Sequence, residues 1–505
     1  MKKGKISIYN AIFSVLNTLI SSIFALVLGK CILTFYGSDY NGINSTITQI
    51  VSAIMLLEGG FTLASNVALF EPFERNDIEK INGILSATSK RFAVVGAVSL
   101  VVGIIVTVIY PLTINNTISK WTIGMMLLTV LIPACINLGF NMRYRVLLLT
   151  SQKEYIISIF STVTYVMGNG VAICLALLGS GILSVRIVIM LSMLLGYVLI
   201  AIYCRVKFPY VDFRQKPLFN EIKGTKNVLV TKILAVVYSS VPMIIISMIP
   251  ETGLVLASVY SVYKNVVYTV KNVLTSVCNA PRLSFGALLA SGETARVKKL
   301  FEQYELIVCI SISVILGTTC LLLLPFVQLY TNGITDVSYI NIPIACIVLL
   351  TAFVEIIHIP SGQIIQMSGN FLATRKIQTV SLIVLAVSMA FGWIFGGMIG
   401  VTLSVLLAAL LLAVLEIFYA GAKILHRKPS DFIKNILPCM IIIVITMIIG
   451  LSGVIPCNSI MTFVICGFLF VVALGAITAF IYSITKRKEL KEVFAIIKGM
   501  FLRYR

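Results

Sequence analysis

The chain contains about fourteen apolar runs, each close to the roughly 20 residues that a helix needs to cross the hydrocarbon core of a bilayer. Mean hydropathy is +1.04, and 59% of the 505 residues are hydrophobic against 11% charged, which exceeds the values of ordinary soluble domains. The sequence therefore predicts an all-α, polytopic membrane protein with about 14 transmembrane helices. The runs lie near residues 8–29, 43–70, 92–113, 122–149, 155–179, 182–204, 227–250, 253–281, 303–325, 343–367, 376–397, 398–421, 433–453 and 460–484.

Basic residues alternate between the two sides of the predicted membrane in a strongly biased way. With the N-terminus inside, the inner loops and the C-terminal tail hold 33 of the 39 Lys and Arg, and the outer loops hold only Lys30, Lys120 and Arg186. The positive-inside rule then predicts an even number of helices with both termini cytoplasmic. The net charge is +20, but the Lys and Arg residues lie between apolar runs and do not gather on a soluble face. We therefore expect no nucleic-acid partner.

Sequence motifs of nucleotide and metal chemistry are absent. No GxxxxGK[ST] and no HExxH pattern occurs, and the eleven cysteines are scattered without a CxxC pair. The external loops are short, the longest running roughly from Phe326 to Ile342, which leaves no room for an extracytoplasmic catalytic domain. We therefore expect no cofactor, no metal and no enzymatic activity.

Internal similarity divides the chain into two halves. FEPFERNDIEKINGILSATSKRF and LLLTSQKEYI in the first half correspond to FGALLASGETARVKKLFEQYELI and IIQMSGNFLATRKI in the second, at an offset of about 217 residues. We predict an N-terminal lobe of helices one to six (1–204), a cytoplasmic linker (205–226), and a C-terminal lobe of helices seven to twelve (227–421). Two extra helices and a basic tail (422–505) follow. Two six-helix repeats have the same orientation, so the lobes are expected to be pseudo-symmetric about an axis along the membrane normal.

Two lysines lie inside the predicted eighth helix, VYSVYKNVVYTVKNVLTSVCNA. Tyr260, Lys264, Tyr268 and Lys271 follow at helical spacing on one face, with Tyr263 beside them. Each lysine at membrane mid-depth costs about 2.5 to 3.5 kcal/mol unless it faces water or a partner. The pattern predicts either a cavity that receives an anionic group or a structural ion pair with Glu58.

Other ionisable residues inside helices are candidates for gating or ion coupling. Glu58 lies in helix two beside Gly59 and Gly60, which can bend the helix, and the repeat offset places it opposite the Lys271 region. Glu355 and His358 lie on one face of helix ten next to the kink-prone IPSG, where they could carry a coupling proton or form a polar packing cluster. Glu416 is expected to snorkel at the cytoplasmic end of helix twelve. Lys232 in helix seven either snorkels or reaches the cavity.

A family resemblance lies mainly in residues 35–111. YGSDYNGINSTITQIVSAIMLLEGGFTLASNVALFEPFERNDIEKINGILSATSKRF, followed by VIYPL, resembles the Wzx-type polysaccharide flippases of the multidrug/oligosaccharidyl-lipid/polysaccharide exporter superfamily. The resemblance implies a V-shaped bundle of two six-helix lobes that alternates between inward-open and outward-open states. The implied substrate is an undecaprenyl-pyrophosphate-linked oligosaccharide, which would cross from the cytoplasmic to the outer leaflet of the bacterial cytoplasmic membrane for cell-surface polysaccharide synthesis.

The resemblance also implies which residues contact the substrate and which partners the protein has. Relatives line the cavity with cations on helices one, two, seven and eight, and in this chain helix eight has Lys264 and Lys271, and helix seven Lys232. Tyr260, Tyr263 and Tyr268 would offer flat surfaces to sugar rings. Membrane lipids are implied partners, together with a polysaccharide polymerase or glycosyltransferases.

Three other functions fit parts of the sequence. A cation-coupled multidrug exporter of the same superfamily would use acidic cavity residues such as Glu58 and Glu355. An integral-membrane polymerase or ligase would need a large external loop, which the chain lacks. A non-catalytic scaffold of a polysaccharide assembly complex would use the basic tail KRKELKEVFAIIKGMFLRYR, a segment that is also typical of binding to anionic lipid.

Overall fold

A computed structural model describes residues 3–58, 60–116, 118–222, 225–279, 289, 294–455, 457–487, 489–490 and 492. Within these ranges the side chains of residues 3–8, 11, 57, 63, 225–235, 277, 279, 294–295 and 429 are outside the description. The described residues form helices and turns and contain no strand, so the predicted all-α fold is confirmed. Contacts divide the chain into two compact units, Met1–Ser258 and Val259–Arg505.

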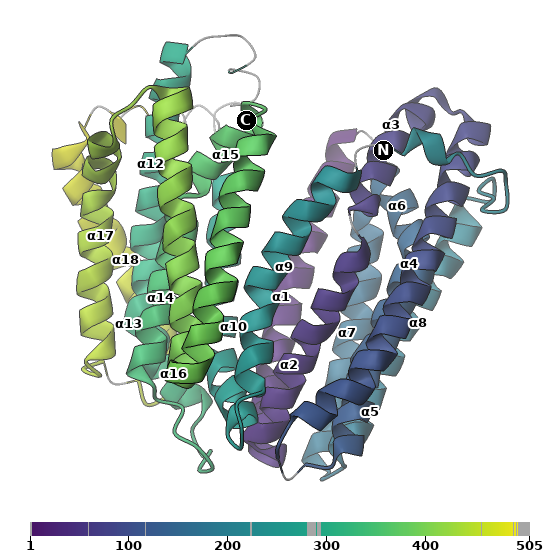
Figure 1. Cartoon of the computed structure of the whole chain (residues 1–505), viewed down its shortest axis with the longest axis horizontal. Coiled ribbons are helices and arrows are strands. Elements are labelled where there is room, and N and C mark those ends of the chain that lie inside the picture. The colour runs from purple at the N-terminus through teal and green to yellow at the C-terminus, as the bar shows by residue number, and fades with distance from the viewer. Residues whose placement is uncertain are drawn as a thin grey trace. The chain divides into compact units, whose positions relative to one another are not determined.

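The first unit contains the helices of the first six predicted spans and of the seventh (Figure 1). α7 packs against both α1 and α8, and α4 packs against α5. The helices are α1 (Lys3–Tyr36), α2 (Ser38–Ile54), the 3₁₀ helix η1 (Met55–Glu58), α3 (Phe61–Arg75), α4 (Ile78–Thr113), α5 (Lys120–Ile136), the π-helix η2 (Asn137–Asn141), α6 (Met142–Thr150), α7 (Glu154–Leu177), α8 (Ile182–Lys207), the short 3₁₀ helix η3 (Phe219–Glu221) and α9 (Thr225–Ser247).

The second unit begins inside α10 (Gly253–Asn279) and contains the remaining spans. α14 and α15 both pack against α16, and α13 packs against α17 and α18. Its helices are α12 (Thr294–Ser311), the π-helix η4 (Ile312–Leu316), α13 (Gly317–Tyr330), α14 (Ile342–Ile357), α15 (Ile359–Met367), α16 (Phe371–Ala420), the π-helix η5 (Gly421–Leu425), α17 (Pro429–Leu451) and α18 (Ile460–Thr485).

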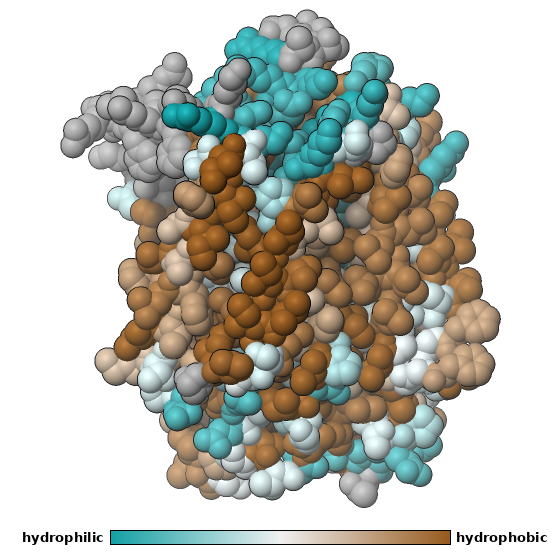
Figure 2. All heavy atoms as spheres, turned by 90° about the vertical axis from the view of Figure 1, so that its left-hand side faces the viewer, coloured by the Kyte–Doolittle hydropathy of each residue, from teal (hydrophilic) through white to brown (hydrophobic). Residues whose placement is uncertain are grey.

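Each of the fourteen predicted spans has a helical counterpart, and among the described residues ten helices are long and apolar enough to cross a membrane. α10 is outside those ten, as expected for a helix that contains two lysines and several polar residues. Figure 2 shows a broad band of apolar side chains on one face of the molecule, with hydrophilic side chains beyond both of its ends. Exposed residues of α17 and α18, such as Ile448 and Phe468, are apolar, as lipid-facing side chains must be.

Several spans are broken at positions where the sequence predicts a bend. Gly60 adopts a left-handed conformation (φ 78°) between η1 and α3, which confirms the predicted bend beside Glu58. His358 separates α14 from α15 at the IPSG segment. Inside the 50-residue α16, Gly397 has a non-helical backbone (φ 53°, ψ −134°), and this residue marks the predicted boundary between helices eleven and twelve.

Two turns of the structure correspond to each other at the offset of the predicted internal repeat. The turn after α6 and the turn after α15 each contain a left-handed residue, Gln152 (φ 60°) and Gly369 (φ 78°), which lie 217 residues apart. The next helices begin at Glu154 and Phe371, at the same offset. Each turn has three backbone hydrogen bonds, and the two sets correspond pair by pair. In the first turn the N–H groups of Ser151, Gln152 and Lys153 donate to the carbonyls of Leu147, Leu149 and Leu148, respectively. In the second turn the N–H groups of Ser368, Gly369 and Asn370 donate to the carbonyls of Ile364, Gln366 and Ile365, respectively.

The predicted linker region packs onto the first unit. Asn82 donates to the carbonyl of Tyr210 at 3.0 Å, and Ser86 donates to the carbonyl of Gln215 at 2.7 Å, so the segment is bound to the first turns of α4. Ser240 of α9 donates to Gln49 of α2 at 3.0 Å. α9 therefore packs on α2 within the unit that ends at Ser258. The lobe ranges 1–204 and 227–421 stay predictions about the repeat.

Candidate functional site

α10 carries both predicted lysines on the polar stripe of an otherwise apolar helix. Lys264 is the eleventh residue after Gly253, about 16 Å along the helix, and Lys271 is about 12 Å before Asn279. The Lys264 ammonium is 5.8 Å from the ring centroid of Tyr260, and the Lys271 ammonium is 5.8 Å from that of Tyr268. The helix therefore holds two cations and two aromatic rings along one stripe.

Lys271 has Glu355 of α14 as its ion-pair partner. The ammonium donates to the Glu355 carboxylate at 2.6 Å, and the two side chains are 25% and 15% exposed. The Lys271–Glu355 pair lies inside the second unit, and the predicted ion pair with Glu58, which belongs to the first unit, stays a prediction. Half-burial strengthens such a pair relative to a surface salt bridge and also makes it costly to break without a substitute anion.

The three tyrosines of the stripe differ in what they can offer to a ligand. Tyr263 is fully buried, donates to the carbonyl of Tyr339 at 2.8 Å and accepts from the N–H of Asn341 at 3.0 Å. Tyr260 is 6% exposed and lies under Lys264, whereas Tyr268 is 48% exposed. In this conformation Tyr268 has an open ring face, and Tyr263 packs the helix against its neighbours.

His358 lies at the break between α14 and α15 and contacts a carboxylate that the sequence did not single out as a site. Its Nδ1 lies 2.8 Å from the Glu416 carboxylate of α16, and the side chains are 12% and 5% exposed. The expectation that Glu416 snorkels is wrong, because α15 and α16 pack together and enclose it. Gly362 packs directly on the Glu416 carboxylate, so a side chain there would displace it.

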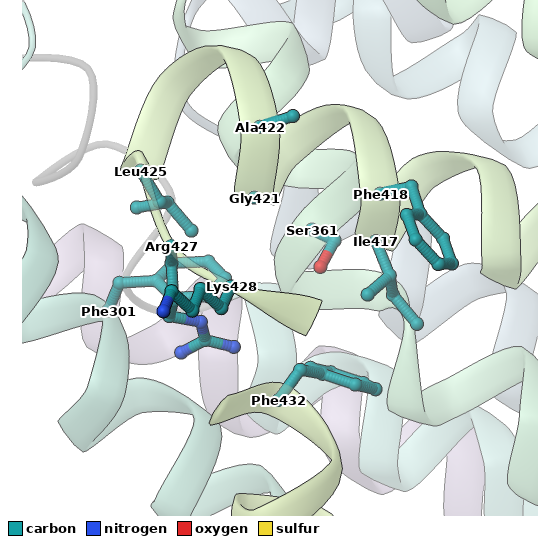
Figure 3. Close-up of a pocket in the computed structure, with 10 residues that line it drawn as sticks. All are labelled: Phe301, Ser361, Ile417, Phe418, Gly421, Ala422, Leu425, Arg427, Lys428 and Phe432. Carbon is teal, nitrogen blue, oxygen red and sulfur yellow. The ribbon is translucent and has the colours of Figure 1, made fainter. Parts of the chain in front are cut away.

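A third buried pair joins α12 to the segment before α17. Arg427 donates to both carboxylate oxygens of Glu305 at 2.7 Å, and Asn435 donates to the same carboxylate at 3.1 Å. Figure 3 shows the Arg427 side chain between Phe301 and Phe432, whose ring centroids lie 5.6 and 5.9 Å from the guanidinium. The sequence places Arg427 in an inner loop as an ordinary base, because nothing in a single sequence pairs it with Glu305.

The first unit holds Glu58 and a further buried cation. Thr62 donates a short hydrogen bond to the Glu58 carboxylate, one turn beyond the break in helix two. Arg186, predicted for an outer loop, is 8% exposed inside α8 and donates to Asn44 at 2.6 Å. Lys232 lies in α9, but its side chain is outside the described residues.

No metal-binding geometry is present in the described part of the chain, where no three His, Cys, Asp or Glu side chains gather. The candidate site consists of pairs of ionisable side chains inside apolar helices: Lys271 with Glu355, and His358 with Glu416. Such residues inside membrane segments are typical of substrate and ion pathways.

Solved structures share this fold. The lipid II flippase MurJ, in an inward closed conformation, matches with a TM-score of 0.67 at 12% identity, over 94% of this chain and 99% of MurJ. An inward-facing multidrug resistance MATE family transporter of the MOP superfamily matches with a TM-score of 0.61 at 14% identity, over 84% of this chain and 99% of that one. MATE in complex with MaL6 matches with a TM-score of 0.52 at 14% identity, over 85% and 97%.

These likenesses define the class of fold. The chain is a polytopic membrane protein with the fold of MurJ and of the MATE transporters of the MOP superfamily, which is the fold that its sequence resemblance implies. No protein-family model and no curated protein matches the sequence. The TM-scores of 0.67 and 0.61 establish the fold, and identities of 12% and 14% leave the function open.

Proposed function

We propose that the protein is a flippase that moves undecaprenyl-pyrophosphate-linked oligosaccharide from the cytoplasmic to the outer leaflet of the bacterial plasma membrane, for cell-surface polysaccharide synthesis. Lys264 and Lys271 on α10 are the observation that carries the proposal. A pyrophosphate cannot enter hydrocarbon uncompensated, and ammonium groups at mid-depth offer it charge-assisted hydrogen bonds. The likeness in fold to MurJ, a lipid II flippase, supports a lipid-linked substrate.

The α10 stripe carries two lysines, which attract an anion and repel a cation. Lys271 pairs with the Glu355 carboxylate of α14, and Lys264 lies on the same stripe. An incoming pyrophosphate can bind Lys264 and replace the Glu355 carboxylate at Lys271. In this proposal the exchange weakens the Lys271–Glu355 pair only when substrate is present, which couples binding to a change in the contact between α10 and α14.

We assign ion coupling to the carboxylates near Lys271, where the substrate would replace Glu355. A Glu355 carboxylate released from Lys271 needs a proton or a cation, because an uncompensated charge is expensive inside the membrane. His358, three residues further along the same helix and paired with Glu416, is the nearest titratable neighbour in sequence. A gating role for Glu58, which lies in the first unit, stays a prediction.

A cation-coupled multidrug exporter is the second candidate, because the second unit buries Glu355, His358 and Glu416 together with the lysines. A cationic drug would be attracted to these carboxylates and repelled by Lys264 and Lys271. The scaffold hypothesis rests on the C-terminal tail, most of which is outside the described residues.

Reconstitution distinguishes the two transport hypotheses. The full chain in proteoliposomes is expected to move a fluorescent undecaprenyl-pyrophosphate-linked disaccharide to a leaflet where dithionite quenches it, at a rate well above that of protein-free vesicles. Ethidium accumulation, driven by a sodium or proton gradient, is the parallel measurement. Ethidium transport without lipid transfer would establish the exporter and contradict the flippase.

A further inference from the structure

Two arginines, one in each unit, are buried to the same extent but have different surroundings. Arg186 of α8 and Arg427, just before α17, are each 8% exposed. Both carboxylate oxygens of Glu305 accept from Arg427 at 2.7 Å, and two aromatic rings flank its guanidinium. The second unit therefore supplies its buried arginine with a negative charge.

Arg186 has no comparable partner among the described residues. Its one hydrogen bond goes to the side-chain oxygen of Asn44 on α2, at 2.6 Å, and this acceptor is neutral. Its Nε atom is buried and has no acceptor in the described part of the chain. No described carboxylate forms an ion pair with the guanidinium. Because a buried cation without a compensating charge is expensive, Arg186 needs an anion from outside the chain.

The surroundings of Arg186 are apolar and closely packed. Its side chain reaches from α8 to α2, and α5 packs against both helices. Val185, beside Arg186, and Ile43, beside Asn44, are fully buried in one hydrophobic cluster. Charges attract each other more strongly in such surroundings than in water. Close packing also favours a small anion over a bulky one such as a pyrophosphate.

Arg186 and Asn44 offer hydrogen-bond donors to a ligand. The Asn44 oxygen accepts from the guanidinium, so its NH₂ group remains as a donor, and the Nε–H of Arg186 is a second donor. The one carboxylate of α2, Asp39, lies about 140° around the helix from Asn44 and accepts from Asn116 at 2.8 Å. Donors next to a full positive charge select an anion.

The pair lies near the ends of its two helices, where an ion can enter. Arg186 is about 6 Å along α8 from Ile182, and Asn44 is about 9 Å along α2 from Ser38. Asn44 is only half-buried. The distribution of Lys and Arg predicts that this end of the first unit faces the outside.

We propose that Arg186 and Asn44 form a binding site for a small inorganic anion of the size and charge of chloride. Bound there, the anion compensates Arg186 as Glu305 compensates Arg427, and it stabilises the packing of α8 against α2. The site lies in the first unit and uses neither lysine of α10, so it is independent of the proposed function.

The melting temperature of the full-length protein in detergent tests the site. Sodium chloride replaces sodium gluconate at constant ionic strength, since gluconate is too bulky for a closely packed site. Chloride should raise the melting temperature of wild type by about 2 to 4 °C, because a ligand of the folded state stabilises that state by mass action. The shift should disappear in Arg186→Gln.

Asn44→Asp is the sharper variant, because it keeps the arginine and replaces a neutral acceptor with a carboxylate of the same shape. Its melting temperature should not depend on chloride and should be at least as high as that of wild type in chloride. Lys120→Gln removes an exposed cation at the start of α5 and should keep the full shift.

Broadening of the chloride signal in chlorine NMR measures binding without unfolding the protein. Wild type and Lys120→Gln should broaden the signal in a saturable way, and Asn44→Asp should not. The proposal is wrong if wild type shows neither the melting shift nor saturable broadening. It is also wrong if Asn44→Asp responds to chloride as wild type does, since the anion would then bind elsewhere.

Discussion

Arg427 and Glu305 illustrate how charges are accommodated in the second unit. Both side chains are less than 5% exposed, and the guanidinium meets the carboxylate through two hydrogen bonds of 2.7 Å. A buried pair of this kind contributes little over an apolar pair of the same shape, but losing one partner strands the other charge.

The first prediction follows from that asymmetry. Arg427→Ala is expected to lower the free energy of unfolding by about 3 to 5 kcal/mol, because the Glu305 carboxylate loses its compensating charge. The melting temperature of the detergent-purified protein, followed by the reactivity of buried cysteines, measures the effect. Lys428→Ala changes the exposed neighbouring cation and is the control. Equal melting temperatures for the two variants would mean that the Arg427–Glu305 pair does not stabilise the fold.

The second prediction concerns the exchange at Lys271. Glu355→Gln removes the carboxylate that competes with a substrate anion, so affinity for undecaprenyl pyrophosphate should rise about three- to tenfold, the equivalent of roughly 1 kcal/mol. Lys271→Gln should lower the same affinity. Binding measured by microscale thermophoresis in nanodiscs compares the three proteins. Weaker binding by Glu355→Gln would show that Glu355 orients Lys271 toward the substrate instead of competing with it.

Single residues were predicted well where their helix alone decides their place. The spacing of Lys264 and Lys271 identifies a stripe on one helix, and the structure confirms the helix. Glu416 was wrongly expected to snorkel, and the burial of Arg427 in its loop was not predicted, because burial depends on which helix packs beside each residue. Helical periodicity contains no information about packing partners when every neighbouring span is apolar.

Helix interruptions were predictable where a glycine or proline causes them. Gly60 and the IPSG segment interrupt a span, and Gly397 separates two predicted spans. The π-helices η2, η4 and η5 were not predicted. η2 and η5 each contain a glycine, but glycines such as Gly96 and Gly103 also lie inside the regular helix α4, so a glycine alone does not identify a widened turn.

The third prediction uses two adjacent glycines of α16. Gly397 has φ 53° and ψ −134°, a region that residues with a Cβ rarely adopt, whereas Gly396 has open space around its Cα. Gly397→Ala should destabilise the protein by about 1 to 3 kcal/mol. Gly396→Ala should be neutral or slightly stabilising, since alanine favours helix. The melting temperatures of both variants test this prediction. An unchanged melting temperature for Gly397→Ala would contradict a non-helical backbone at Gly397.

The turn around Gln152 recurs 217 residues later around Gly369, and the repeat of helices one to six as seven to twelve stays a prediction from sequence similarity. The turns around Gln152 and Gly369 have corresponding hydrogen bonds although their sequences, TSQKE and MSGNF, share only serine at the same place. The contact boundary at Ser258 was not predicted, because it depends on the packing of α9 against α2.

The fourth prediction concerns orientation in the membrane. The bias of Lys and Arg predicts a cytoplasmic linker and C-terminus and an external 331–341 loop. Alkaline phosphatase fused after Gly333 should be active, and the same enzyme fused after Gln215 should be inactive. Green fluorescent protein at the C-terminus should fluoresce. The reverse pattern would show that the topology is inverted and that the distribution of Lys and Arg does not report the orientation.

The most direct measurement of the whole account is the rate at which proteoliposomes flip a lipid-linked disaccharide, for wild type and for Lys264→Gln combined with Lys271→Gln. Lys90→Gln combined with Lys207→Gln removes two exposed lysines and is the control. We predict that the control flips as wild type does and that the α10 variant folds but loses at least about tenfold in rate, the equivalent of roughly 1.4 kcal/mol. Equal rates for all three proteins would show that the α10 lysines do not bind the substrate.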